Sequence, residues 1–238
     1  MEHADFVTII GKQCEFLRAA ALAAGPDADV PTCPRWTVSR LVGHLARVQS
    51  WVAGALADPT GAHIKPGRPP EGWDELLAWW DEQRAAMIAA LADPDAPAWL
   101  PWQRYPQVAA SWARRQAHEA AIHRLDAESA RGEVPSPLFE PDFAADGIDE
   151  LISTMAPART DWSKVSLSGT VVVHATDVDR VWSVHLKPGV EPVIDTTGLD
   201  GDALIAGTAD AVYRQVWGRP SEATVTGDTA LLEPLAAP

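Results

Sequence analysis

The chain is poor in basic residues and has no long apolar run. Of its 238 residues, 19 are Lys or Arg and 33 are Asp or Glu, which gives a net charge of −14. Nucleic-acid binding depends on Lys and Arg that displace counterions from phosphates, so this balance argues against a nucleic-acid partner. No stretch approaches the roughly 20 apolar residues that span a bilayer, and the first ten residues lack the basic start of a signal peptide. We therefore expect a cytoplasmic protein without a membrane partner.

Cysteine is scarce, and several familiar motifs are missing. Cys14 and Cys33 are the two cysteines, and they lack the CxxC spacing. They are read as ordinary thiols, because two such residues build neither a disulfide scaffold nor a zinc ribbon. GxGxxG, GxxxxGKS/T, GxSxG and HExxH are all absent, and HEAAIH at 118–123 is one residue longer than the last of these. The usual nucleotide-binding and hydrolase signatures are therefore excluded.

The chain is predicted to contain two domains. Three prolines within residues 132–143 stop any helix there and mark a surface crossover, so the domains are placed at 1–138 and 139–238. Apolar periodicity and Pro, Gly and Asp clusters predict four helices in the first domain, at about 4–24, 37–57, 72–92 and 107–131. Helices of this length pack most simply as an antiparallel four-helix bundle, whose core is a usual place for a metal site.

In the second domain the hydrophobic pattern changes from the period of helices to that of strands. A helix is expected near 144–157, and β-branched runs at 170–177, 180–187 and 191–197 predict a strand meander. Helices at 208–217 and 228–236 flank one more short strand at 222–226. The predicted fold class is therefore α+β, with a helical bundle followed by a small α+β domain.

The stretch WARRQAHEAAIHRLDAE, residues 112–128, is the most informative for chemistry. Glu119 and His123 are four residues apart, so on a helix they project from one face with an offset of about 40°. His44 lies on the flank of the apolar stripe of helix 37–57 and would point toward a neighbouring helix. Two histidines and one carboxylate leave coordination positions open for water or substrate, as in catalytic metal sites. His44, Glu119 and His123 are therefore candidate metal ligands.

Plainer interpretations remain open at this point. Arg115, Glu119 and His123 follow one another at four-residue steps, which also suits a solvated row of charges on an exposed helix. His44 is equally compatible with a satisfied half-buried histidine. The basic residues form no evident dicarboxylate clamp, and surface solvation is expected for the scattered candidates Arg35, Arg47, Arg104 and Arg124.

Tryptophan is abundant, with 11 residues. Most should pack in the core with a partner for the indole N–H. Trp51 follows His44 by seven residues and Trp112 precedes Glu119 by seven, so each shares a helix face with a candidate ligand. Trp51 and Trp112 are therefore predicted to wall the site where a cofactor would bind.

Three segments together resemble the mycothiol-dependent maleylpyruvate isomerase family. They are WTVSRLVGHL at 36–45, AHEAAIHRLDAE at 117–128 and the run DALIAGTADAVYRQVWGRPSEATVTGDTALLEPL at 202–235. The resemblance implies a DinB-like four-helix bundle with a metal site, followed by a C-terminal α+β domain that looks similar to sterol-carrier folds. It places the family's metal ligands on His44, Glu119 and His123. It also aligns Arg219, in WGRP, with an arginine that holds a carboxylate.

The resemblance implies an enzyme that uses a divalent metal, typically zinc, and the thiol mycothiol or a similar one. In such an enzyme the ion helps to activate the thiol, which adds to a small electrophile and permits isomerisation, or is transferred to it. Two alternatives stay open because one fold supports several chemistries. One is a non-catalytic small-molecule-binding protein, and the other is a metal-dependent hydrolase that needs no thiol.

Overall fold

The computed structural model describes residues 1–132 and 138–237, and it divides the chain into two compact units. The first unit spans Glu2–Ser136 and the second Pro137–Pro238. The expected domain boundary after residue 138 directly follows residues 133–137, and Pro135 and Pro137 lie outside the described residues. Each unit is described by itself.

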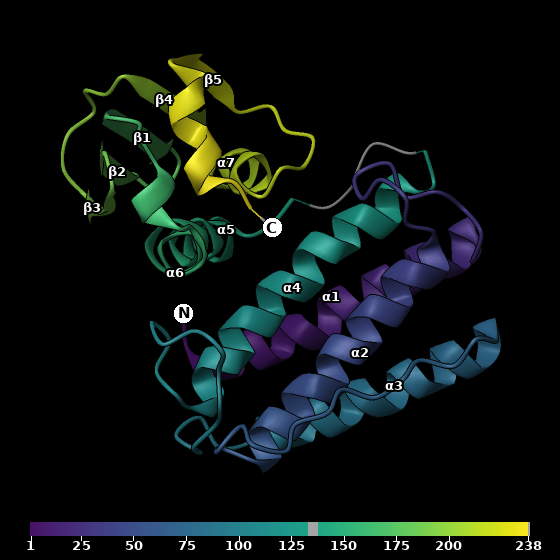
Figure 1. Cartoon of the computed structure of the whole chain (residues 1–238). Coiled ribbons are helices and arrows are strands. Elements are labelled where there is room, and N and C mark those ends of the chain that lie inside the picture. Colours follow the sequence, from purple (N-terminus) through teal and green to yellow (C-terminus); the bar gives the residue numbers. More distant parts are fainter. Residues whose placement is uncertain (133–137, 238) are drawn as a thin grey trace. The chain divides into compact units, whose positions relative to one another are not determined.

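The first unit is a bundle of four helices (Figure 1). They are α1 (His3–Ala24), α2 (Val38–Ala57), α3 (Trp73–Ala90) and α4 (Ala109–Ser129). Their ends lie within two residues of the predicted ranges. Thr37 caps the start of helix α2, because its hydroxyl accepts a hydrogen bond from the backbone N–H of Arg40. In the apolar stripe of α2, Val38, Leu41, Leu45 and Val52 are completely buried.

The direction of α3 differs from the expectation of an antiparallel bundle. Leu76, near the start of α3, packs against Gly43 near the start of α2. Further along both helices, Nε1 of Trp80 donates to Oε1 of Gln49 at 2.9 Å. Because the contacts advance together along the two helices, α2 and α3 run parallel. The simple antiparallel prediction is therefore wrong for this pair.

The segment 58–72 makes the parallel arrangement possible. It returns along α2 before α3 begins, with Ile64 beside Gly54 and Pro69 beside Gly43. The backbone N–H of Gly67 donates to the Ser50 hydroxyl at 3.0 Å and fixes the middle of the segment. We call residues 58–72 the return segment. The return segment covers part of the surface of α2.

Helix α4 is buried along most of its length, and three of its charged residues are buried with it. Arg115, Arg124 and Asp126 are 3%, 1% and 0% exposed. Charges so deeply buried need partners, because an unpaired buried charge is very costly. The expectation that Arg124 is solvated is therefore wrong, and the solvated row of charges is excluded as an account of this helix.

The second unit is a five-stranded sheet with helices. Its helical elements are α5 (Pro141–Asp149), a π-helical turn (Glu150–Met155), α6 (Ala156–Arg159), a 3-10 turn (Trp162–Lys164), α7 (Ala209–Val216) and a 3-10 helix (Thr229–Leu235). Its strands are β1 (Gly169–Ala175), β2 (Arg180–Lys187), β3 (Val190–Asp195), β4 (Ala203–Gly207) and β5 (Thr224–Gly227). The strand order is β3-β2-β1-β4-β5, and α7 packs on β1, β4 and α5.

The predicted meander is present, but one strand was missed. β1, β2 and β3 pair antiparallel as expected, whereas β4 lies parallel to β1. β4 has the sequence ALIAG, in which Ile205 is the single β-branched residue, so propensity gives little signal. Among the described residues, none of the helices has the length and apolar character to cross a membrane.

Candidate metal centre

The structure brings together His44 from α2 with Glu119 and His123 from α4. Oε1 of Glu119 lies 3.2 Å from Nε2 of His44 and 3.3 Å from Nε2 of His123. One donor atom from each residue lies within 4.8 Å of the other two. Ligands bound tetrahedrally to zinc at ordinary bond lengths are separated by about 3.3 Å. The three side chains therefore fit a small divalent ion with little rearrangement.

The group is sheltered on one side and open on the other. The side chains of His44, Glu119 and His123 are 36%, 20% and 11% exposed. His123 is therefore the inner member, and His44 faces the surface. A site with three protein donors and one open side retains room for water or another ligand, as catalytic zinc sites do.

His123 is oriented by a second carboxylate behind it. Nδ1 of His123 donates to Oδ2 of Asp126 at 2.8 Å, and Asp126 is completely buried. The hydroxyl of Thr32, from the segment between α1 and α2, donates to the other oxygen of Asp126 at 2.5 Å. A carboxylate that holds Nδ1–H directs the lone pair of Nε2 outward, which is the arrangement of metal-binding histidines.

Glu119 is oriented in a similar way by Arg115, one helical turn earlier. Nη2 of Arg115 lies 3.1 Å from Oε2 of Glu119. Oε2 is thus engaged by the guanidinium, while Oε1 faces the two histidines. The four-residue steps from Arg115 to Glu119 and His123 placed Arg115 on the same helix face as the two ligands. Thr32 was not singled out, because its contact depends on a loop distant in sequence.

Electrostatics couple Glu119 and His123. Burial disfavours the charged form of both, but their mutual attraction and hydrogen bonds prevail. They hold the pKa of Glu119 well below its ordinary value and raise the pKa of His123 to about 9, the latter with help from Asp126. Without a metal, His123 is therefore protonated at neutral pH. An ion that binds here must displace that proton.

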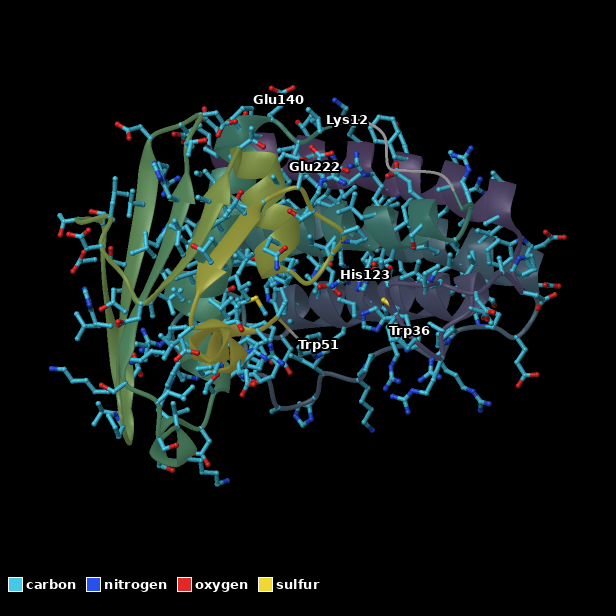
Figure 2. All side chains as sticks on the ribbon, turned by 90° about the horizontal axis from the view of Figure 1, so that it is seen from above. Lys12, Trp36, Trp51, His123, Glu140 and Glu222 are labelled. Carbon is cyan, nitrogen blue, oxygen red and sulfur yellow. The ribbon has the colours of Figure 1, made fainter. Side chains whose placement is uncertain are left out.

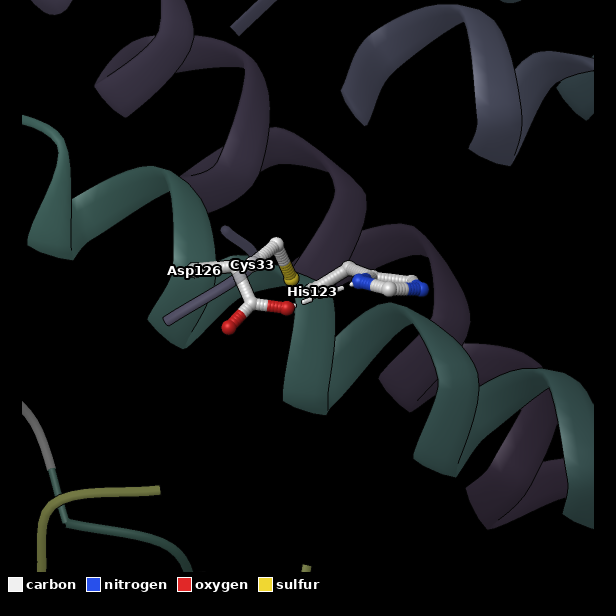
Figure 3. Close-up of side chains that lie close together, drawn as sticks. All are labelled: Cys33, His123 and Asp126. Atoms are coloured by element: carbon white, nitrogen blue, oxygen red, sulfur yellow. Dashed lines mark hydrogen bonds and ion pairs between the residues drawn. The ribbon is translucent and has the colours of Figure 1, made fainter. Parts of the chain in front are cut away.

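A second donor group overlaps the first and consists of Cys33, His123 and Asp126. Their donor atoms also lie within 4.8 Å of one another, and Figure 3 shows Cys33 and Asp126 together beside His123. Cys33 was read as an ordinary thiol, and its sequence spacing gives no sign of this position. In this group Nδ1 of His123 faces Asp126, whereas Nε2 faces Glu119. The two groups therefore lie on different edges of one imidazole ring.

Three tryptophan rings lie near the candidate metal ligands, at different depths. The ring of Trp36 lies 5.0 Å from that of His44 and 6.1 Å from that of His123. Figure 2 labels Trp36, Trp51 and His123 among the side chains of the chain. Trp51 lines a hollow of about 230 Å³ beside His44. Trp112 is completely buried, packs edge-on against Trp51 and donates to the backbone carbonyl of Trp99. Of the two tryptophans predicted to wall the site, Trp51 thus lies at the surface of the hollow and Trp112 supports it from the core.

Arg219 belongs to the second unit, whereas all three candidate metal ligands belong to the first. It follows α7, and its Nη1 donates to the backbone carbonyl of Trp217 at 2.6 Å. Its carboxylate-binding role remains a prediction.

Comparisons with known proteins identify the family. The model of the mycothiol maleylpyruvate isomerase N-terminal domain matches residues 10–128, and that of the MDMPI C-terminal domain matches residues 142–234. No curated protein matches the chain. Two similar crystal structures are those of the mycothiol-dependent maleylpyruvate isomerase and of a histidine-to-alanine mutant of it. They are 16% and 15% identical, with TM-scores of 0.59 and 0.62, and each alignment covers 96% of this chain and 94% of the other. Because the two family models together cover most of its length, the chain belongs to the mycothiol maleylpyruvate isomerase family.

Proposed function

We propose that the chain is a metal-dependent enzyme that uses a low-molecular-weight thiol, mycothiol or a close analogue, on a small electrophilic substrate. The reaction is isomerisation of the substrate or transfer of the thiol to it. The observation that carries this proposal is the convergence of Nε2 of His44, Nε2 of His123 and Oε1 of Glu119 at the spacing of metal ligands. Membership of a family named for a mycothiol-dependent isomerase supports the same chemistry.

His44, Glu119 and His123 would hold the ion. When bound, a divalent metal such as zinc stabilises a thiolate at neutral pH. The chain supplies the orientation: Asp126 keeps the proton of His123 on Nδ1, and Arg115 keeps Oε2 of Glu119 occupied. These partners leave the converging donor atoms directed at one point.

The thiol must come from outside the chain. Cys33 lies with Asp126 at the Nδ1 edge of His123, while the candidate ligands converge at the Nε2 edge. Cys14 is completely buried, and burial raises its pKa to about 11. Neither cysteine is placed to act as the reacting thiol. An external thiol fits the open side of the group beside His44.

Reversible addition of a thiolate explains isomerisation without a redox step. The sulfur adds to one carbon of a double bond conjugated to a carbonyl group, and the former double bond can then rotate. Departure of the same thiolate restores the double bond in its new geometry. We propose that Trp36 and Trp51 limit water around the reacting atoms and that Arg219 binds an acidic group of the substrate or cofactor.

Metal content and thiol dependence test this function together. The full chain is purified without a metal-affinity tag, and its metal is measured by mass spectrometry beside H44A, E119A and H123A. We expect about one equivalent of a divalent ion per chain, lost in each variant, and turnover of an electrophile only when a thiol is supplied. Metal-dependent turnover without a thiol would instead indicate a hydrolase. A wild-type chain that stays empty when offered zinc would indicate a binding protein.

A further inference from the structure

Two hollows meet at His44, both formed by α2 and the return segment. The larger, of about 480 Å³, is lined by Trp36, Arg40, His44, Arg47 and Pro69, among others. The smaller, of about 230 Å³, is lined by His44, Arg47, Val48, Trp51 and Pro66. His44 and Arg47 border both hollows. A ligand in either one would therefore lie directly beside a candidate metal ligand.

Two arginines stand on either side of His44 along α2. Arg40 precedes it by four residues and Arg47 follows it by three, so all three project from one helix face within about 60°. Each arginine lies about one helical turn from His44. The guanidinium of Arg40 stacks on the ring of Trp36 at 5.5 Å, which restricts its orientation. The expectation that Arg47 is merely a solvated side chain overlooks this common face.

Both guanidinium groups are available to an anion. Within residues 1–132 and 138–237, neither Arg40 nor Arg47 forms an ion pair with a carboxylate. Glu71 also lines the larger hollow, but it is exposed and lies 3.9 Å from Arg68. Two cations against one outward carboxylate make the hollow locally positive. The whole chain is acidic, with a net charge of −14, and this hollow is a local exception whose excess of positive charge favours anions.

We propose that Arg40 and Arg47 form an anion subsite that binds the carboxylate of a small electrophilic substrate beside His44. This inference rests on the proposed function and adds to it the two residues that would bind an acidic group of the substrate. A guanidinium binds a carboxylate through paired N–H donors, and two such groups fix its orientation. The apolar hollow beyond Arg47, walled by Val48 and Trp51, is suited to the uncharged part of the same molecule.

Calorimetric titration of the full chain tests the subsite with two unreactive probes, succinate and its uncharged diamide. The titration is run on metal-free and zinc-loaded protein at low salt, because salt screens exposed charges. We expect succinate, but not the diamide, to bind both forms. R40Q and R47Q should each weaken binding by about tenfold, and the double variant should abolish it. K12Q removes one positive charge from α1, outside both hollows, and should bind as the wild type does.

The outcomes separate this inference from the proposed function. Succinate binding that survives in the double variant overturns the subsite, as does binding confined to the zinc-loaded form or failure of the wild type to bind. The double variant should keep the wild-type denaturant unfolding midpoint, which shows that it folds, and should retain zinc, which shows that the metal centre is intact. A chain that holds no zinc but binds succinate through Arg40 and Arg47 would overturn the proposed function and leave the anion subsite standing.

Discussion

Asp126 is completely buried and accepts a hydrogen bond at 2.8 Å from Nδ1 of His123, on the edge of the imidazole ring opposite the one that faces Glu119. This pair joins the core of α4 to the candidate metal centre. The carboxylate has a partner in Thr32 as well, so its position is fixed from two directions. The ring of His123 is therefore held with Nε2 directed toward His44 and Glu119.

Replacement of Asp126 by Asn should weaken metal binding. Asn keeps the size of the side chain but removes the charge that holds Nδ1–H, so His123 loses both its fixed tautomer and part of its basicity. Loss of such an outer partner typically costs 10- to 100-fold in affinity, roughly the decrease expected here. Competition with a chromophoric zinc chelator measures it. D74N, on the exposed side of α3, is the matched control, and equal affinity in folded D126N would contradict the orienting role.

The two overlapping donor groups predict opposite results for two single substitutions. If the ion is held by His44, Glu119 and His123, C33S should retain one equivalent of zinc, because Cys33 belongs to the other group. H44A should lose its zinc, because only two of the three donors, Glu119 and His123, remain. Metal analysis of both variants after dialysis against a weak chelator distinguishes the groups. Loss of zinc from C33S together with its retention by H44A would assign the ion to Cys33, His123 and Asp126.

The stability of the metal-free protein should fall as pH rises from about 6.5 to 9. Burial opposes the charge on His123, but Glu119 and Asp126 raise its pKa from the ordinary 6.5 to about 9 in the folded state. A raised pKa means that the folded state binds the proton more tightly, so this contribution is complete below pH 6.5 and is lost as pH approaches 9. Denaturant unfolding at a series of pH values measures the effect.

Two controls accompany the pH series. H123A should lack this part of the slope, because the titrating group is gone. Saturating zinc should also remove it, because the ion replaces the proton on His123. A wild-type protein whose metal-free stability is flat between pH 6.5 and 9 would show that the attraction between His123 and Glu119 does not stabilise the fold.

Local sequence patterns predicted most of the helices because each pattern depends on neighbours in the chain. The cap at Thr37 and the apolar stripe of α2 are properties of a few consecutive residues. Spacing also placed Glu119 and His123 on one face of α4, which the structure shows. His44 was predicted to join them because it lies on the flank of the apolar stripe of α2. The family resemblance pointed to the same three residues.

The features that were missed depend on contacts distant in sequence. The parallel course of α2 and α3 follows from the return segment, whose path is set by tertiary packing and carries no periodic signal. Thr32 and Cys33 approach α4 from a loop about 90 residues earlier in the chain. β4 is short and rich in Ala and Gly, so its pairing with β1 rather than its own propensity makes it a strand.

Replacement of Gly67 by Ala should disturb the return segment without removing the metal ligands. A Cβ at Gly67 would lie 2.6 Å from the Trp79 ring and 2.9 Å from the Ser50 hydroxyl, so the segment must shift. Overpacking of this kind typically costs about 1–3 kcal/mol. G67A should therefore unfold at a lower denaturant concentration and retain zinc. It should also bind succinate more weakly, because the return segment walls both hollows.

G11A is the control, because it lies on α1 with open space around its Cβ, and it should be neutral or stabilising. Unaltered stability and succinate affinity in G67A would show that the segment accommodates the methyl group and does not shape the hollows.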